Sequence, residues 1–220
     1  MGRELVVLGA ASVALNVLEI ATALGYEVLS MVDETLPQDV EPQPRFGVPV
    51  ERSIDRWLDN RRVSLAVAIG DNLRRARAVE RLLRYVDETR FPSLVHPAAS
   101  VSPFATVGPG CFVLPCSAIV ANAQLGGFNY VSSNTMVGHD VVVNRGAWIG
   151  AGASLGGWSV IGARTFVGMN SVIREKVTIG EDVVVGAGSY VNCDLEDRVV
   201  AVGSPARILR SRDPDDPYLR

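Results

Sequence analysis

The sequence predicts two domains in series: an α/β domain with a βαβ start over residues 1–95, and a parallel β-helix over residues 96–210. The β-helix is indicated by Val, Ile or Leu at every sixth position from Val101 to Val191, without one interruption. Period six is a multiple of the strand period of two and not of the helical 3.6, so these side chains share one face. A hexapeptide repeat is the sequence signature of a parallel β-helix.

The α/β domain begins with a short buried strand over residues 5–8, followed by the turn Gly9-Ala10-Ala11-Ser12. A helical pattern runs from about residue 13 to residue 24, and a second strand over residues 27–32 ends at Asp33. This order is typical of nucleotide-binding domains, in which free amides at the helix start receive a phosphate or ribose. A dinucleotide fingerprint requires more glycines, so a plain strand-to-helix turn remains the alternative.

A further buried strand over residues 65–69 ends in Gly70-Asp71-Asn72, and an Arg-rich amphipathic helix follows to about residue 86. His96-Pro97 then closes the domain, and we interpret His96 as structural because its backbone is held extended before proline.

Within the repeat, glycine follows the aliphatic residue at nine of the sixteen positions. We expect these glycines to form tight corners with positive φ. After the last repeat, residues 194–198 are interpreted as a solvated loop before a final strand at residues 199–202, and residues 211–220 as an exposed tail.

Composition excludes several classes of function. The net charge of −3 gives no indication of nucleic-acid binding, and no long apolar run or leader predicts a membrane span or a signal peptide, so we expect a cytoplasmic protein. The three cysteines form no metal-binding motif and are expected to be reduced. The two histidines, His96 and His139, cannot supply the three ligands of a carbonic-anhydrase-type zinc site, so no metal is expected.

The chain resembles the bacterial nucleotide-sugar N-acetyltransferases of the bacillosamine and perosamine type, with sialic-acid O-acetyltransferases as close relatives. The resemblance rests on the Val-Leu-Gly-Ala turn, Asp33, Ala68-Ile69-Gly70-Asp71-Asn72, His96-Pro97-Ala98, Gly138-His139-Asp140 and Gly203-Ser204-Pro205-Ala206-Arg207. It implies a left-handed β-helix of about five 18-residue coils with three faces each, a homotrimer, and acetyl-CoA in a groove between neighbouring coils.

The resemblance also implies roles for individual residues. His139 corresponds to the base that deprotonates the sugar amine, and Asp140 to the acid that raises its basicity. The N-terminal domain would hold the nucleotide through Gly9, Ala10, Ala11, Ser12, Asp33 and Gly70. The acetyl-CoA groove would be lined by Gly157, Met169 and Ala187, and by Trp148, which occupies the place of a second histidine of the family.

The residues themselves support this chemistry. An amine that attacks a thioester must lose a proton, and histidine is suited to accept it at neutral pH. Adjacent strand residues point to opposite faces, so Asp140 reaches His139 only at a corner of the coil. One coil above His139, Gly156-Gly157 leaves room for a pantetheine arm beside a backbone N–H that could polarise the carbonyl.

Tyr130, Trp148 and Phe166 are spaced by 18 residues and are expected to stack outside the coil. We predict that this ladder lines the contact between subunits and part of the acetyl-CoA groove. A ladder that only stabilises the coil is the alternative.

The predicted reaction is acetylation of a nucleotide-linked 4-amino-4,6-dideoxy sugar for surface polysaccharide or glycan synthesis. O-acetylation of a sialic acid and a purely structural or ice-binding β-helix are the alternatives. The nucleotide stays open between GDP, UDP and dTDP, and Asp140 in place of glutamate favours perosamine by analogy.

Overall fold

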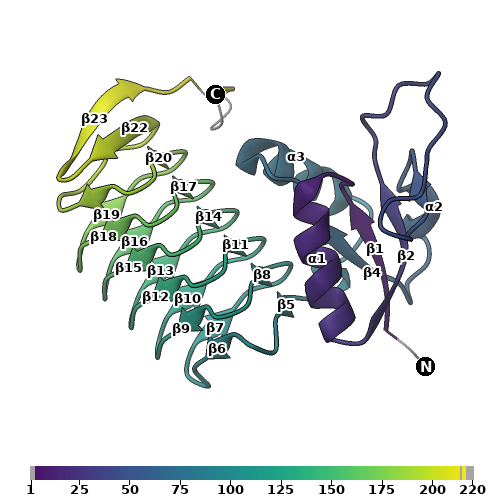
Figure 1. Ribbon diagram of the computed structural model, residues 1–220, viewed down its shortest axis with the longest axis horizontal. Helices are drawn as coiled ribbons and strands as arrows, with labels where there is room; N and C mark the ends of the chain where they lie inside the picture. The colour runs from purple at the N-terminus through teal and green to yellow at the C-terminus, as the bar shows by residue number, and fades with distance from the viewer. Residues whose placement is uncertain (1–2, 214, 217–220) are drawn as a thin grey trace.

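The computed structural model describes residues 3–213 and 215–216, and it confirms the predicted fold class of an α/β domain followed by a left-handed parallel β-helix (Figure 1). Pro214 and residues 217–220 of the predicted tail lie outside the described residues.

The N-terminal domain contains one parallel sheet in the order β3-β2-β1-β4. Its strands are β1 (Arg3–Leu8), β2 (Tyr26–Val32), β3 (Val50–Glu51) and β4 (Ser64–Val67). Its helices are α1 (Ser12–Ala23), α2 (Asp55–Leu58), α3 (Asn72–Leu82) and the short 3-10 helix η1 (Glu88–Arg90). β1 pairs in parallel with β2, and α1 connects them in the chain, so the predicted βαβ start is confirmed.

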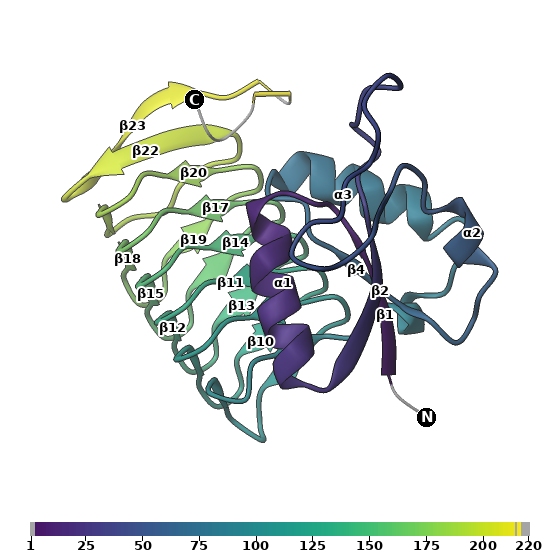
Figure 2. The same ribbon diagram turned by 45° about the vertical axis from the view of Figure 1, so that its right-hand side comes forward.

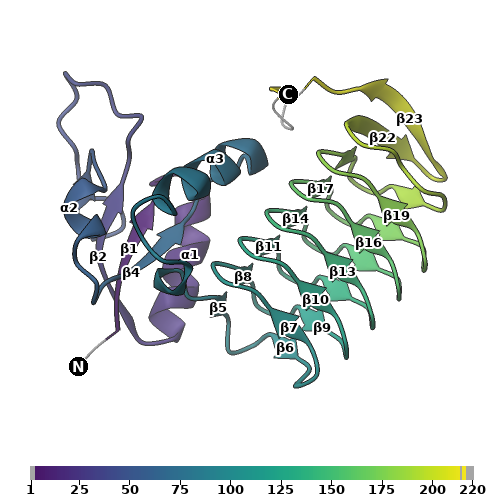
Figure 3. The same cartoon turned by 180° about the vertical axis from the view of Figure 1, so that it is seen from behind.

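The β-helix consists of short strands that form three sheets within the described residues (Figure 3). From β5 to β21 each paired strand lies 18 residues from its parallel partner, whereas β22 pairs with β20 at a spacing of 16 and β23 pairs antiparallel with β22. The eight-stranded sheet contains β5 (Leu94–Val95), β8 (Phe112–Val113), β11 (Tyr130–Val131), β14 (Trp148–Ile149), β17 (Phe166–Val167), β20 (Val184–Val185), β22 (Val199–Gly203) and β23 (Ala206–Ser211). The six-stranded sheet contains β6 (Ser100–Val101), β9 (Ala118–Ile119), β12 (Met136–Val137), β15 (Ser154–Leu155), β18 (Val172–Ile173) and β21 (Tyr190–Val191). The five-stranded sheet contains β7 (Thr106–Val107), β10 (Gln124–Leu125), β13 (Val142–Val143), β16 (Val160–Ile161) and β19 (Thr178–Ile179).

The glycines that follow the aliphatic residues do not have the positive φ that we expected. Positive φ occurs two residues later, for example at Asn122, Asp140 and Gly146. At Gly162, an added Cβ would lie 2.1 Å from the carbonyl oxygen of Gly180 in the next coil. These glycines are therefore required because successive coils approach each other closely, and not because of their backbone conformation.

The C-terminal end of the coil is closed by side chains of the segment interpreted as a solvated loop. Asp194 accepts a hydrogen bond from the Thr178 amide and Asp197 one from the Glu181 amide, both at 2.8 Å. These carboxylates satisfy backbone donors at the end of the coil and remain exposed, so the solvated interpretation holds for both of them. The described part of the predicted exposed tail also makes contacts, because Asp215 forms an ion pair with Arg77 of α3 at 2.6 Å.

Arg75 of α3 joins the two domains and is almost fully buried, at 2% exposure. Its guanidinium donates to the carbonyl oxygens of Ile69 (3.0 Å) and Gly70 (3.3 Å) in its own domain. It also donates to those of Phe128 (3.3 Å) and Gly146 (2.7 Å) in the β-helix. Arg75 therefore fixes the start of α3 against the coil, as the position of α3 beside the strands in Figure 2 illustrates.

Among the described residues, no helix is long and apolar enough to cross a membrane.

Candidate active site

A cavity of about 600 Å³ lies between the N-terminal domain and the β-helix. The N-terminal domain contributes Ala11, Ser12, Val13, Gly70, Asp71 and Arg74. The β-helix contributes Ser132, Trp148, Gly150, Ala151, Phe166 and Met169. The starts of two helices, α1 and α3, thus meet the aromatic outer surface of the eight-stranded sheet.

The N-terminal wall of this cavity is suited to an anion. No side chain caps the start of α1, where Ala11 is the N-cap residue and Ser12 is exposed. A helix N-terminus with free amides attracts a phosphate through its N–H groups and its dipole. At the start of α3, the Asp71 side chain accepts a hydrogen bond from the Arg74 amide at 2.9 Å, which leaves the exposed Arg74 side chain at the cavity to bind negative charge.

Gly9 and Asp33 belong to the N-terminal domain but do not line the cavity. Gly9 has a φ of +113°, and a Cβ there would lie 2.5 Å from the carbonyl oxygen of Ala68, so only glycine fits the turn. Asp33 follows β2 and accepts hydrogen bonds from the amide (3.1 Å) and hydroxyl (2.6 Å) of Thr35. Arg45 lies 3.7 Å from Asp33 and donates to the carbonyl oxygen of buried Ala10 at 2.5 Å. Asp33 does not line the cavity.

The aromatic ladder forms the wall that belongs to the β-helix. Tyr130 and Trp148 stack with ring centroids 3.8 Å apart, and Phe166 lies 6.2 Å from Trp148. The predicted stacking is thus confirmed for Tyr130 and Trp148, whereas the rings of Trp148 and Phe166 are tilted by 32°. The predicted exposure is wrong for Tyr130, which is buried against α1. Its hydroxyl accepts a hydrogen bond from Asn16 of α1 at 2.6 Å. Within this chain, the aromatic ladder faces the N-terminal domain.

His139 and Asp140 lie at a different corner of the coil, after β12. The Nδ1 atom of His139 is 2.8 Å from Oδ2 of Asp140, and the amide group of Asn122, one coil below, donates to Oδ1 at 3.3 Å. The contact with His139 holds the pKa of the Asp140 carboxyl below its usual range, and the bond from Asn122 lowers it further. An ionised carboxylate only accepts hydrogen bonds, so in the neutral imidazole this contact places the proton on Nδ1 and the lone pair on Nε2.

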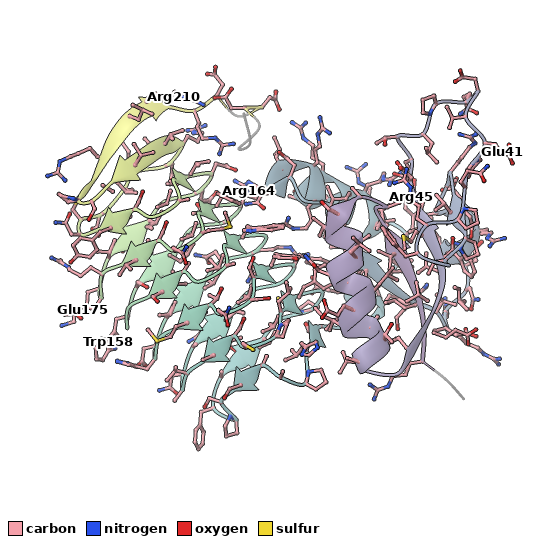
Figure 4. All side chains as sticks on the ribbon, in the orientation of Figure 1. Glu41, Arg45, Trp158, Arg164, Glu175 and Arg210 are labelled. Carbon is pink, nitrogen blue, oxygen red and sulfur yellow. The ribbon has the colours of Figure 1, made fainter. Side chains whose placement is uncertain are left out.

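The Nε2 atom of His139 lies directly over Gly157. A Cβ built on Gly157 would be 2.7 Å from both Nε2 and Cε1 of the imidazole. The next residue, Trp158, meets the imidazole edge-to-face, with ring centroids 4.3 Å apart. Trp158 lies at the coil edge remote from the N-terminal domain (Figure 4).

The predicted site residues therefore fall into two groups within one chain. Ala11, Ser12, Gly70, Trp148 and Met169 line the cavity, with Gly9, Ala10 and Asp33 behind it and Ala187 one coil beyond Met169. His139, Asp140 and Gly157 lie at the corner after the six-stranded sheet. The width of that sheet separates them from the cavity, about 15–20 Å of extended chain.

Several residues near these groups were not predicted. Asn122 lies 18 residues before Asp140 and Lys176 lies 18 after Trp158, so the coil spacing alone could have found both. Arg74 and Ser132 line the cavity but carry no sequence signal that separates them from surface residues. His96 accepts a hydrogen bond from the Ala98 amide at 3.0 Å, which fits the predicted structural role.

Both domains of the chain are similar to those of known proteins. Residues 4–82 match the PglD N-terminal domain, and residues 159–193 match the bacterial transferase hexapeptide repeat. A perosamine N-acetyltransferase from Caulobacter crescentus, solved with CoA and GDP-perosamine as a histidine-to-asparagine variant, is 31% identical over 94% of this chain and 97% of that one, with a TM-score of 0.86. The chain belongs to the bacterial nucleotide-sugar N-acetyltransferases.

A second similar structure is the acetyltransferase domain of PglB from Neisseria gonorrhoeae with acetyl coenzyme A. It is 30% identical to this N-acetyltransferase over 95% of the chain and all of the domain, with a TM-score of 0.85. WeeI from Acinetobacter baumannii shares the fold at 21% identity and a TM-score of 0.82. None of the curated protein sequences matches the chain.

Within the described residues, this N-acetyltransferase has no group of three or more His, Cys, Asp or Glu side chains that could hold a metal ion. The cavity and the His139 corner are instead built from helix N-termini, aromatic rings and one imidazole–carboxylate pair, which are groups suited to an anionic nucleotide and to proton transfer.

Proposed function

We propose that this N-acetyltransferase moves the acetyl group of acetyl-CoA to the amino group of a nucleotide-linked 4-amino-4,6-dideoxy sugar, with His139 as the general base. The observation that carries the proposal is the His139–Asp140 contact of 2.8 Å, which leaves Nε2 as a proton acceptor over Gly157. GDP-perosamine is the first candidate substrate, because the Caulobacter relative was solved with it. The product would serve surface polysaccharide or glycan synthesis.

The reaction begins when the neutral amine attacks the thioester carbonyl. As the C–N bond forms, Nε2 of His139 takes the surplus proton from nitrogen, and the carboxylate of Asp140 stabilises the imidazolium that results. The Gly157 amide has no hydrogen-bond acceptor within the described chain, so it is available to donate to the developing oxyanion. When the C–S bond breaks, the CoA thiolate leaves and takes the proton from the imidazolium.

The cavity between the domains is the proposed nucleotide-sugar site. The N-terminal domain, residues 1–95, would hold the phosphates at the start of α1 and beside Arg74. The β-helix, residues 96–210, would contribute Trp148 and Phe166, whose rings can stack on a base or a sugar ring. About 600 Å³ is within the usual range for sites of small molecules.

A homotrimer completes this proposal. The cavity and His139 lie at different corners of one coil, so a complete site needs His139 of one subunit beside the cavity of another. A closed symmetric assembly repeats that contact at every interface. Because acetyl-CoA and nucleotide sugars are intracellular metabolites, we place the reaction in the cytoplasm.

The direct test is a CoA-release assay with GDP-perosamine, UDP- and dTDP-linked 4-amino sugars and free sialic acid. We expect rapid turnover of one nucleotide-linked amino sugar and a loss of at least about 100-fold in kcat for His139→Ala. Turnover of sialic acid alone would identify an O-acetyltransferase, and a fully active His139→Ala would refute the assigned base.

Subunit mixing tests the shared site. His139→Ala and Arg74→Glu carry their defects at different corners, so each alone should be nearly inactive. In an isolated mixed trimer of either composition, about a third of the sites should be restored, namely the one in which an intact His139 meets an intact cavity. No restoration in isolated mixed trimers would show that each site lies within one chain.

A further inference from the structure

We infer that Trp158 is a positioning residue for the base, holding the His139 imidazole in the orientation that aims Nε2 over Gly157. This inference rests on the proposed role of His139. The two rings lie at 90° with centroids 4.3 Å apart, and the Trp158 amide donates to the His139 carbonyl oxygen at 3.1 Å. Edge-to-face contacts of this kind are the preferred geometry of aromatic pairs.

The coil backbone places the indole of Trp158 beside the imidazole. Trp158 has a φ of +59°, the left-handed conformation of the corners, which Asn122 tolerates but which Phe128 and Lys176 also adopt. The conformation therefore belongs to the repeat. What distinguishes this corner is that it carries an indole in edge-to-face contact with the proposed base.

The exposure of the two side chains within one chain is a reason to assign Trp158 a function. The His139 side chain is 48% exposed and Trp158 is 53% exposed, so packing into the core of its own coil does not explain the indole. The ammonium group of Lys176, one coil further on, lies 5.5 Å from the indole ring centroid, and this cation–π contact favours the observed orientation of the indole. Trp158 thus presents one edge-to-face aromatic contact to a half-exposed imidazole.

The hydrogen bond to Asp140 cannot supply this constraint alone. Both partners are partly exposed, at 48% for the His139 side chain and 34% for that of Asp140, so water competes for this bond. The Gly157 backbone limits the imidazole on one side, since a Cβ there would lie 2.7 Å from Nε2. Trp158 limits it on another, so that the Nε2 lone pair keeps one direction, which proton transfer requires.

The test replaces Trp158 by Asn, Leu and Phe in the full-length protein. Trp158→Asn should relieve the backbone strain and leave the melting temperature unchanged or higher, yet lower kcat about tenfold with both KM values unchanged. Trp158→Leu should lower kcat similarly, whereas Trp158→Phe should recover most of it. Cys116→Asn is the matched control: Cys116 also has positive φ (+62°) but lies at another corner, and its kcat should not change.

NMR of the imidazole checks that the two rings meet in solution, while the loss in kcat without a change in KM and its recovery in Trp158→Phe separate positioning from a purely structural role. The chain has two histidines, so His139→Ala assigns both sets of ring signals. Ring current from Trp158 should displace the His139 signals in the wild type, and Trp158→Leu should bring them close to random-coil positions. An unchanged kcat in Trp158→Asn, or a rise in the acetyl-CoA KM alone, would overturn the inference. If His139→Ala were active, the proposed function would fail instead, so the two failures are distinguishable.

Discussion

His139 and Asp140 are neighbours in the chain, and yet their side chains meet, with Nδ1 2.8 Å from Oδ2. On a regular strand they would point to opposite faces. Asp140 has a φ of +58°, so the chain turns at this corner and the carboxylate points toward the imidazole. The corner conformation that the repeat uses in every coil thus creates the imidazole–carboxylate pair of the proposed active site.

Replacing Asp140 by Asn tests what the carboxylate contributes. Asparagine has the same shape and tolerates positive φ, so the melting temperature should stay within about 2 °C of the wild type. Without the negative charge the imidazolium loses its stabilisation, and kcat should fall about 100-fold. Asn122→Ala removes only the second hydrogen bond to Asp140 and should cost less than about tenfold. Steady-state kinetics that found Asp140→Asn as active as the wild type would contradict the pairing.

Gly157→Ala tests whether the His139 imidazole needs the open space next to Gly157. The added methyl would lie 2.7 Å from Nε2, so the imidazole must rotate away, and kcat should fall at least about tenfold. Because the effect acts through His139, the same change in a His139→Ala background should add almost no loss. A further large loss in the double variant would mean that Gly157 acts on acetyl-CoA and not on the base.

The sequence predicted the architecture because one pattern recurs in every coil. Period six placed the aliphatic residues inside, and the 18-residue spacing placed Tyr130, Trp148 and Phe166 in one stack. The nine glycines were predicted to have positive φ, but the structure requires them for close approach between coils. Glycine serves both purposes. The sequence pattern is the same in both cases.

The placement of the N-terminal domain could not be predicted from the repeat. It depends on a few contacts between domains, such as the bond from Asn16 to Tyr130 and those of Arg75 to backbone carbonyls. As a result, Trp148 was assigned to the outer surface, where the structure has a cavity. One signal was available: Arg75 shares a helix face with buried Val79 and Leu82, where a surface arginine would not lie.

Arg75→Met should destabilise the protein by about 3 kcal/mol. The change leaves carbonyl oxygens of both domains without their donor at a buried interface. Thermal unfolding and limited proteolysis should show a lower melting temperature and an N-terminal domain that is cleaved more readily. Arg84→Met, at an exposed position just after α3, is the control and should change stability by less than about 0.5 kcal/mol. Equal stability of the two variants would contradict the role of Arg75.

The Cys111 thiol predicts how stability depends on pH. Burial raises its pKa from 9.0 to about 11 in the folded chain. Between these values the unfolded chain loses the proton and the folded chain keeps it, so stability should fall as the pH rises above 9. The fall should be smaller in Cys111→Ala. In the native protein a thiol reagent should modify exposed Cys116 and Cys193 but reach Cys111 only after unfolding. Rapid modification of Cys111 in a Cys116→Ser, Cys193→Ser variant would show that the burial is wrong.

Trp148→Ala decides which ligand the aromatic ladder serves. Trp148 lines the cavity with Ser12, Gly70 and Arg74, on the side of the coil remote from Trp158, so it should contact the nucleotide sugar. Loss of one stacked ring costs about 1–3 kcal/mol, which corresponds to a rise of about 5- to 150-fold in the nucleotide-sugar KM. The acetyl-CoA KM and the molecular mass in solution should not change, and Trp148→Phe should retain most of the affinity. If the acetyl-CoA KM rose instead, Trp148 would belong to the cofactor groove, and if the mass fell to that of a monomer, the ladder would belong to the subunit interface.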